Sequence, residues 1–205
     1  MKLQLAFDNS SAEEFFTVME QVKDVIDVVE LGWLGNHLGA IFIKEVKAKY
    51  PNIPLVWDQK SATMFDCMPP VEYGADFVSI AFCNEAMAKA VVDLAHPKGT
   101  KVVGDLVHSA CDGQAVLKFV NAGCDEISLF PFMSYDDHDV APLKVVNILK
   151  EKYGFNTSVY GKLTVDNMAP VLEQKPDIIV IGAAIVKAAD PHAAAVQIKE
   201  LMSKY

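Results

Sequence analysis

The chain contains no arginine. All 18 basic residues are lysines, and they stand against 27 acidic residues, for a net charge of −9. A protein of this charge repels polyanions, so nucleic-acid binding is not expected. Without a guanidinium group, an anionic ligand has to be held by lysine, by backbone N–H groups or by a metal ion.

Cysteine and histidine are scarce and carry no metal-binding pattern. The five histidines show no HxH or HExxH spacing, which argues against the familiar zinc enzymes. No CxxC pair occurs among the four cysteines, so neither a disulfide framework nor a structural zinc site is expected. The sequence instead predicts reduced, partly buried thiols at Cys67, Cys83, Cys111 and Cys124.

Long apolar runs are also missing. None reaches the ~18 residues that a membrane span needs, and the N-terminus lacks the apolar stretch and cleavage site of a signal peptide. We therefore expect no membrane association and a cytoplasmic location. The 205 residues are 52% hydrophobic, enough for a full-sized core, and no linker-like segment divides them. A single domain over residues 1–205 is predicted.

Short apolar runs alternate with longer amphipathic segments. Several runs are rich in Val and Ile, as strands buried on both faces should be. The predicted strands are 3–7, 26–31, 54–58, 76–82, 101–106, 126–130, 156–161 and 177–182. A capping box at Ser11–Glu14 opens the first predicted helix. Later helices are predicted near 36–49, 85–96, 112–122, 139–153, 165–173 and 191–204.

This alternation predicts an α/β protein with a single-domain (β/α)8 TIM barrel, because right-handed parallel crossovers close an eight-stranded sheet. A doubly wound open sheet is the alternative, and the even strand count and regular spacing favour closure. In a TIM barrel the chemistry belongs at the C-terminal ends of the strands. That rule selects candidate site residues without reference to any family.

Four carboxylates and one lysine occupy predicted strand ends. Carboxylates on neighbouring strands can coordinate Mg²⁺, which prefers hard oxygen ligands. A lysine among carboxylates stays protonated and can offset negative charge that develops on a substrate. The group therefore predicts enolate or enediolate chemistry on a small oxygenated substrate. Its members are Asp8, Glu30, Asp58, Lys60 and Asp105.

Glycines follow the last two predicted strands. Gly161-Lys162 comes after strand seven, and Gly182-Ala183 opens an Ala-rich turn after strand eight. In phosphate-binding barrels these two loops hold the phosphate through backbone N–H groups. The pattern predicts a phosphate site, with the Lys162 ammonium adding a positive charge.

An ordered set of motifs spans essentially the whole chain. It comprises LQLAFDN at the start, VVELG (28–32), WDQK (57–60), GADFVSI (74–80), VVGDL (102–106) and IVIGAAIVKAADP (179–191). With these motifs the chain resembles the orotidine 5′-phosphate decarboxylase superfamily. It is most similar to the metal-dependent branch of 3-keto-L-gulonate 6-phosphate decarboxylase and 3-hexulose 6-phosphate synthase.

The resemblance implies a role for each matched residue. Metal binding falls to Glu30 and Asp58, and stabilisation of the enediolate to Lys60. Substrate contacts are implied for Asp8 and Asp105. The phosphate-loop glycines correspond to Gly161 and Gly182. The resemblance also implies a homodimer, for which Trp33-Leu34, Phe65, Met68 and Pro69-Pro70 offer apolar material.

Several positions depart from the family pattern. Thr63 stands where the DxKxxD motif has its second Asp, and Asp66 lies one turn further on. The strand-six segment reads Phe130 to Met133 where the family carries proton-handling residues. Lys162 replaces a loop glycine, and Ala183 replaces an Arg but also occurs in the synthases. Other proton donors considered are His108, Tyr135 and His138.

The leading interpretation is a Mg²⁺-dependent carbon–carbon lyase, a decarboxylase of 3-keto-L-gulonate 6-phosphate type that acts on a sugar phosphate through an enediolate. Loss of CO₂ and aldol cleavage give the same intermediate, so an aldolase of 3-hexulose 6-phosphate synthase type is an alternative. A non-catalytic sugar-phosphate-binding homologue is another. A ribulose-phosphate epimerase is less favoured, because its paired His/Asp ligands are not seen at the strand ends.

Overall fold

Eight parallel strands close into a barrel in this computed structural model, which describes residues 1–8, 11–107, 113–130 and 142–205. Each strand pairs with the next along the chain, and β8 pairs with β1. The predicted (β/α)8 TIM barrel is therefore confirmed, and the open sheet is excluded. The strands are β1 (Lys2–Phe7), β2 (Val28–Leu31), β3 (Leu55–Ser61), β4 (Phe77–Ile80), β5 (Lys101–Asp105), β6 (Glu126–Leu129), β7 (Asn156–Val159) and β8 (Ile178–Ile181).

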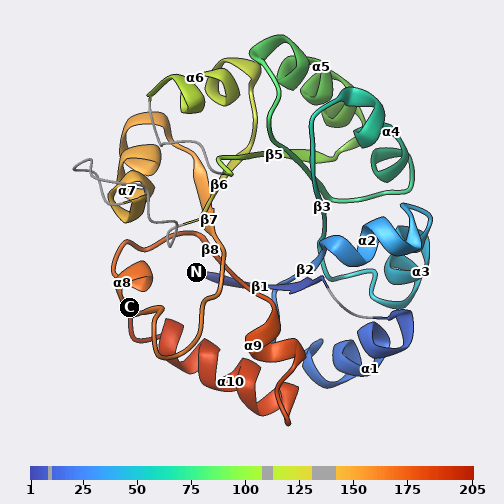
Figure 1. Cartoon of the computed structure of the whole chain (residues 1–205), viewed down its shortest axis with the longest axis vertical. Helices are drawn as coiled ribbons and strands as arrows, with labels where there is room; N and C mark the ends of the chain where they lie inside the picture. Colours follow the sequence, from blue (N-terminus) through green and yellow to red (C-terminus); the bar gives the residue numbers. More distant parts are fainter. Residues whose placement is uncertain (9–10, 108–112, 131–141) are drawn as a thin grey trace.

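Helices surround this barrel as an outer ring (Figure 1). On the first half of the chain they are α1 (Ala12–Val22), α2 (Trp33–Leu38), α3 (Phe42–Lys49), α4 (Met64–Glu72) and α5 (Glu85–Ala95), followed by the short 3₁₀ helix η1 (His96–Lys98). On the second half they are α6 (Gly113–Ala122), α7 (Pro142–Tyr153), α8 (Ala169–Leu172), α9 (Ala183–Val186) and α10 (Pro191–Met202).

The helices differ from the predicted ones in three places. The predicted helix 36–49 is split into α2 and α3, because Gly39 adopts a φ of 75° that ends α2. The predicted helix 165–173 shrinks to the single turn α8. The sequence did not predict α4, which contains Pro69 and Pro70 and begins at the side-chain cap of Thr63.

The strands bury both faces but in different ways. The outward side chains Leu3, Leu5 and Phe7 are fully buried in the large apolar cluster beneath the helices. The inward side chains of the barrel form only a small apolar cluster of Ala6, Ile178 and Val180. Apart from Val56 and Val103, much of the remaining interior is polar where most TIM barrels carry aliphatic layers. Its buried polar members include Gln4, Glu30, Ser79, Asp105, Glu126, Ser128 and Ser158.

The thiols behave as predicted wherever the structure describes them. Cys67, Cys83 and Cys124 are free and buried. Burial raises the pKa of Cys67 to about 11 and that of Cys124 to about 12, which makes both thiols unreactive at neutral pH. Cys111 lies outside the described residues. Within the described ranges no helix has the length and apolar character needed to cross a bilayer. The cytoplasmic location stays a prediction.

Candidate active site

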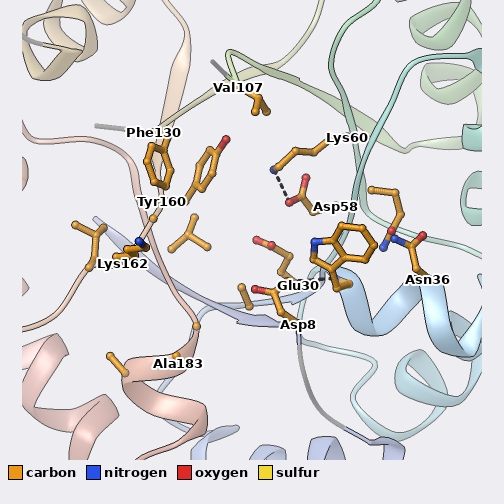
Figure 2. Close-up of a pocket in the computed structure, with 18 of the residues that line it drawn as sticks. Asp8, Glu30, Asn36, Asp58, Lys60, Val107, Phe130, Tyr160, Lys162 and Ala183 are labelled. Carbon is orange, nitrogen blue, oxygen red and sulfur yellow. Dashed lines mark hydrogen bonds and ion pairs between the residues drawn. The ribbon is translucent and has the colours of Figure 1, made fainter. Parts of the chain in front are cut away.

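Predicted site residues from three neighbouring strands converge at the mouth of the barrel. Asp8 follows β1, Glu30 lies on β2, and Asp58 and Lys60 lie on β3. All four line one cavity of about 1000 Å³ at the C-terminal ends of the strands (Figure 2). The rule that places chemistry at this rim therefore selected residues up to 52 positions apart in the sequence, and the fold brings them to one cavity.

The end of β3 presents its two charged side chains to the same side. Asp58 and Lys60 are two positions apart, and side chains two apart on a strand share a face. Lys60 has a φ of 49°, uncommon for a residue other than glycine, where the register against β4 becomes irregular. Its backbone N–H donates to Ser79 Oγ at 3.0 Å. On the opposite face Gln59 Nε2 donates to the Gly32 carbonyl at 2.5 Å, which ties β3 to the end of β2.

Lys60 forms the centre of an ion network. Its Nζ lies 2.7 Å from Asp58 Oδ2 and 2.7 Å from Asp105 Oδ2. Burial alone would lower the pKa of Lys60, but the charges of Asp58 and Asp105 outweigh burial and raise that pKa. The side chain is therefore a fixed ammonium group, as the sequence predicted.

Asp105 lies beneath the mouth. Its side chain is 1% exposed and does not line the cavity. Both carboxylate oxygens are engaged: Oδ2 accepts from Lys60, and Oδ1 accepts from the Tyr160 hydroxyl at 2.9 Å. Burial raises the pKa of Asp105 to about 6, and the Lys60 ammonium opposes that rise. Asp105 therefore lies with the other predicted residues, below the cavity, where it binds the Lys60 ammonium group. A direct contact with substrate stays a prediction.

Glu30 is buried beside Asp58. Its Oε2 accepts a hydrogen bond from Gln4 Nε2 at 2.5 Å. Burial first, and then the nearby Asp58 carboxylate, raise the pKa of Glu30 well above its ordinary value. A cation placed between the two carboxylates would relieve this repulsion.

These two carboxylates fit Mg²⁺. The ion commonly takes one or two carboxylates from a protein and completes its shell with water and substrate oxygens. Among the described residues no group of three or more acidic, histidine or cysteine side chains is arranged for a metal. A site made of Glu30 and Asp58 therefore depends on substrate or water for its remaining ligands. Magnesium stays a prediction.

Asp8 is exposed at the rim. Its Oδ1 accepts a hydrogen bond from the backbone N–H of Trp33 at 3.1 Å, which links the end of β1 to the start of α2. The Trp33 indole is 65% exposed and lines the same cavity. Asp8 therefore lies where a bound ligand can reach it.

The predicted phosphate residues form the opposite wall of the cavity. Gly161 (φ 105°) and Lys162 (φ 50°) make the turn after β7, and Gly182 caps the short α9. The Asn167 amide braces this turn by donating to the Lys162 carbonyl at 2.9 Å. Figure 2 shows Lys162 and Ala183 across the cavity from Asp58. The two predicted halves of the site thus face one another.

Two residues that depart from the family pattern have a structural role in this chain. The Phe130 ring packs over the Cα of Gly161, in the space where any Cβ at that position would lie. Thr63 caps α4, and its hydroxyl donates to Asp66 Oδ2 at 2.7 Å, so Asp66 is an exposed capping partner. A further departure, Met133, and the alternative proton donors His108, Tyr135 and His138 lie outside the described residues.

Sequence reasoning missed two members of the site, Tyr160 and Gln4. Tyr160 follows β7 and Gln4 lies on β1, and both sit in inward positions within runs that otherwise look like core. The available signal was alternation: Gln4 shares a face with Ala6, and Tyr160 with Ser158.

Comparison with known proteins identifies the family. Residues 1–198 match the model of the "Orotidine 5'-phosphate decarboxylase / HUMPS family". The 3-hexulose-6-phosphate synthase of Bacillus subtilis strain 168 is 27% identical over 208 residues, covering 98% of this chain and 99% of the relative. The crystal structure of 3-hexulose-6-phosphate synthase from Salmonella typhimurium superposes with a TM-score of 0.87 at 25% identity, covering 100% and 99% of the two chains.

A decarboxylase of the same branch shares the fold. The 3-keto-L-gulonate-6-phosphate decarboxylase of Vibrio cholerae superposes with a TM-score of 0.83 at 19% identity, covering 100% of this chain and 98% of the other. The predicted resemblance is confirmed, and so is the predicted class of enzyme, a carbon–carbon lyase, at the level of the family. The chain belongs to the orotidine 5′-phosphate decarboxylase / HUMPS family, among its sugar-phosphate carbon–carbon lyases.

Proposed function

We propose that this chain is an aldolase of the 3-hexulose-6-phosphate synthase type, which makes and breaks a carbon–carbon bond of a 3-ketohexose 6-phosphate. In a 3-ketose the aldol bond lies between C1 and C2, so cleavage releases formaldehyde and leaves an enediolate over C2 and C3. The observation that carries the proposal is the Lys60 ammonium, held at 2.7 Å by two carboxylates and facing a lysine-bearing glycine turn across one cavity.

The geometry supports a proposal of separate tasks for the two walls. Lys162 and the turns at Gly161 and Gly182 suit the phosphate, because they combine a cation with backbone N–H groups. Binding energy at that end positions the reacting end over β1 to β3. There Lys60 stabilises the negative charge that develops on the enediolate oxygens, in a partly buried setting that strengthens the interaction.

Magnesium belongs to the proposal. Glu30 and Asp58 would hold the ion, which when bound would supply Lewis-acid polarisation of substrate oxygens. The chain's own residues then orient those oxygens toward Lys60. Gln4 fixes one oxygen of Glu30, so this carboxylate keeps a single orientation.

The curated relatives favour the aldolase over the decarboxylase. Two relatives that match 98% and 100% of this chain, from Bacillus subtilis and Staphylococcus saprophyticus, are named 3-hexulose-6-phosphate synthase and 3-hexulose-6-phosphate synthase 2. The residues at the reacting end suit both reactions, because loss of CO₂ and aldol cleavage leave the same enediolate for Lys60 to stabilise.

The first prediction tests the activity itself. The purified protein with Mg²⁺ is expected to release formaldehyde from 3-hexulose 6-phosphate, and a chelator is expected to stop the release. Lys60→Ala is expected to lower kcat/KM by at least about 100-fold, because a preorganised charge is lost from the transition state. The matched control is Lys204→Ala, which removes an exposed lysine at the C-terminus and should leave turnover unchanged.

Two results would contradict the aldolase. Faster turnover of 3-keto-L-gulonate 6-phosphate, read as CO₂ release, would favour the decarboxylase. Calorimetric binding of both sugar phosphates without turnover of either would favour the non-catalytic homologue.

A further inference from the structure

We propose that Tyr160 is a positioning residue that holds Lys60 in place from two directions, through Asp105 and through the face of its own ring. This inference rests on the proposed function for its kinetic consequence, because Lys60 is the group whose position limits catalysis there. Tyr160 belongs to neither predicted half of the site, and it lies between them (Figure 2).

The first direction is a chain of hydrogen bonds across three strands. The Tyr160 hydroxyl donates to Asp105 Oδ1 at 2.9 Å, and Asp105 Oδ2 lies 2.7 Å from Lys60 Nζ. Since the Asp105 side chain is only 1% exposed, solvent water is not at hand to replace either partner. The hydroxyl therefore fixes the carboxylate, and the carboxylate fixes the ammonium.

The second direction is the aromatic face. Lys60 Nζ lies 4.5 Å from the centroid of the Tyr160 ring, within the range of a cation–π interaction. Such contacts are stronger when the cation is partly desolvated, and the Lys60 side chain is 28% exposed. Asp58, Asp105 and the ring thus approach the ammonium from three sides.

Tyr160 is itself held in place. Its ring centroid lies 5.4 Å from that of Phe130, and Phe130 packs over Gly161. Burial raises the pKa of the Tyr160 phenol, so the hydroxyl remains a neutral donor across the working range of pH. The Phe130 and Gly161 pair therefore supports the ring, and the ring supports Lys60.

Loss of the hydroxyl has a defined consequence. Asp105 Oδ1 would become a buried acceptor without a donor, which is costly, so the carboxylate would turn to seek another partner. Lys60 would then pair with Asp58 alone and move relative to the reacting carbons. Displacements of about 1 Å cost up to about 100-fold in rate. The phosphate wall is untouched, so substrate affinity should change little.

The experiment compares Tyr160→Phe with Tyr50→Phe. The control removes a similar hydroxyl-to-carboxylate bond, from Tyr50 to Glu20 at 2.8 Å, away from the mouth. We expect Tyr160→Phe to lower kcat for 3-hexulose 6-phosphate by about 10- to 100-fold with KM changed by less than about threefold. Tyr50→Phe should leave both constants unchanged. A kcat for Tyr160→Phe equal to that of the wild type would overturn the proposal.

A double-mutant cycle tests the route through Asp105. If Tyr160 acts through this carboxylate, Tyr160→Phe should have little further effect on kcat in an Asp105→Asn background. Losses that simply multiply would show that the hydroxyl acts independently of Asp105, and that outcome also overturns the proposal.

A readout without turnover separates this inference from the proposed function. Acylation of Lys60 by a small N-hydroxysuccinimide ester, followed by peptide mass spectrometry, reports how firmly the amine is held. The expected result is faster labelling of Lys60 in Tyr160→Phe than in the wild type, with Lys162 labelling unchanged as the internal control. Unchanged Lys60 labelling refutes the positioning role. Absence of turnover in the wild type refutes the proposed function alone.

Discussion

Glu126 is a carboxylic acid buried inside the barrel, away from the mouth. It lies on β6 with an exposure of 5%, among Gln4, Ser128 and Ser158. Burial raises its pKa to about 7, and a hydrogen bond with Ser158 and the charges of Lys2 and Lys101 only partly offset this rise, while Asp177 adds to it. The proposed chemistry makes no use of this group, so its ionisation can be read as a stability effect.

The sign of that effect follows from linkage. The folded-state pKa of Glu126 is above the unfolded value of 4.5, so between pH 4.5 and 7 the folded state binds more protons. Glu126 therefore lowers the free energy of unfolding as the pH rises through this window, by up to about 3 kcal/mol. Above pH 7 the loss is complete.

Glu126→Gln should remove this part of the pH dependence. Urea unfolding at pH 5 and pH 8 is the measurement, and the variant should lose less stability between the two than the wild type. Glu173→Gln, at an exposed glutamate on the surface, is the matched control and should follow the wild type. Curves for Glu126→Gln that run parallel to the wild type would contradict the buried-acid account.

The site residues at the strand ends could be predicted from the sequence, but the side chains that they contact could not. Asp58 and Lys60 were found because a charged pair after an apolar run is informative. Tyr160 was missed because an aromatic residue at the end of such a run reads as core. Its role depends on a carboxylate 55 positions away, which only the closed sheet brings within reach.

Local signals decided which elements could be predicted. The capping box of α1 is confirmed: Ser11 Oγ accepts from the Glu14 N–H at 3.1 Å, and Glu14 Oε2 accepts from the Ser11 N–H at 2.9 Å. The break at Gly39 and the proline-containing α4 were missed, because apolar periodicity does not register a turn within an amphipathic stretch. Packing against the barrel determines where helices form and end in such segments.

At the scale of a single structural element, a prediction concerns the turn after β7. Gly161→Ala should lower stability and weaken phosphate binding, because φ is 105° and the added methyl would overlap the Phe130 ring. Gly154→Ala is the matched control, because its φ is 71° and nothing lies within 4 Å of the place that an added methyl would take. We expect the control to lose about 1 kcal/mol and Gly161→Ala to lose about 1–3 kcal/mol more.

Thermal unfolding and calorimetry with inorganic phosphate measure the two effects. Equal losses of stability in Gly161→Ala and Gly154→Ala would mean that the Phe130 ring moves aside at no cost in free energy. The Phe130 contact would then not explain the requirement for glycine in this turn.

At the scale of the molecule, the closed barrel was predictable because eight alternating units with short connections leave few topologies open. Assembly was harder to predict. Of the apolar residues that suggested an interface, Leu34 and Pro70 are buried within the subunit. Pro69 is exposed and Met68 is half-buried, and the largest exposed side chains of the group are Trp33 and Phe65, at 65% and 72% exposure.

We propose that these two exposed side chains contribute to a homodimer interface, as the family resemblance implies. Sedimentation equilibrium should then give twice the chain mass of 22.4 kDa. Phe65→Glu should shift the mass toward one chain, because it places a charge in an apolar contact. Ile148→Glu, at an exposed apolar residue of α7 across the barrel from α4, should leave the mass unchanged (Figure 1). A wild-type mass of one chain would contradict the interface.

The ion network around Lys60 also bears on self-inactivation. Formaldehyde, the product expected of the proposed reaction, condenses with neutral amines to give imines and crosslinks, whereas an ammonium group has no lone pair to attack it. A lysine clamped between Asp58 and Asp105 is therefore shielded chemically at the place where the aldehyde is set free. The same contacts that position the charge would protect Lys60 from covalent modification by the product.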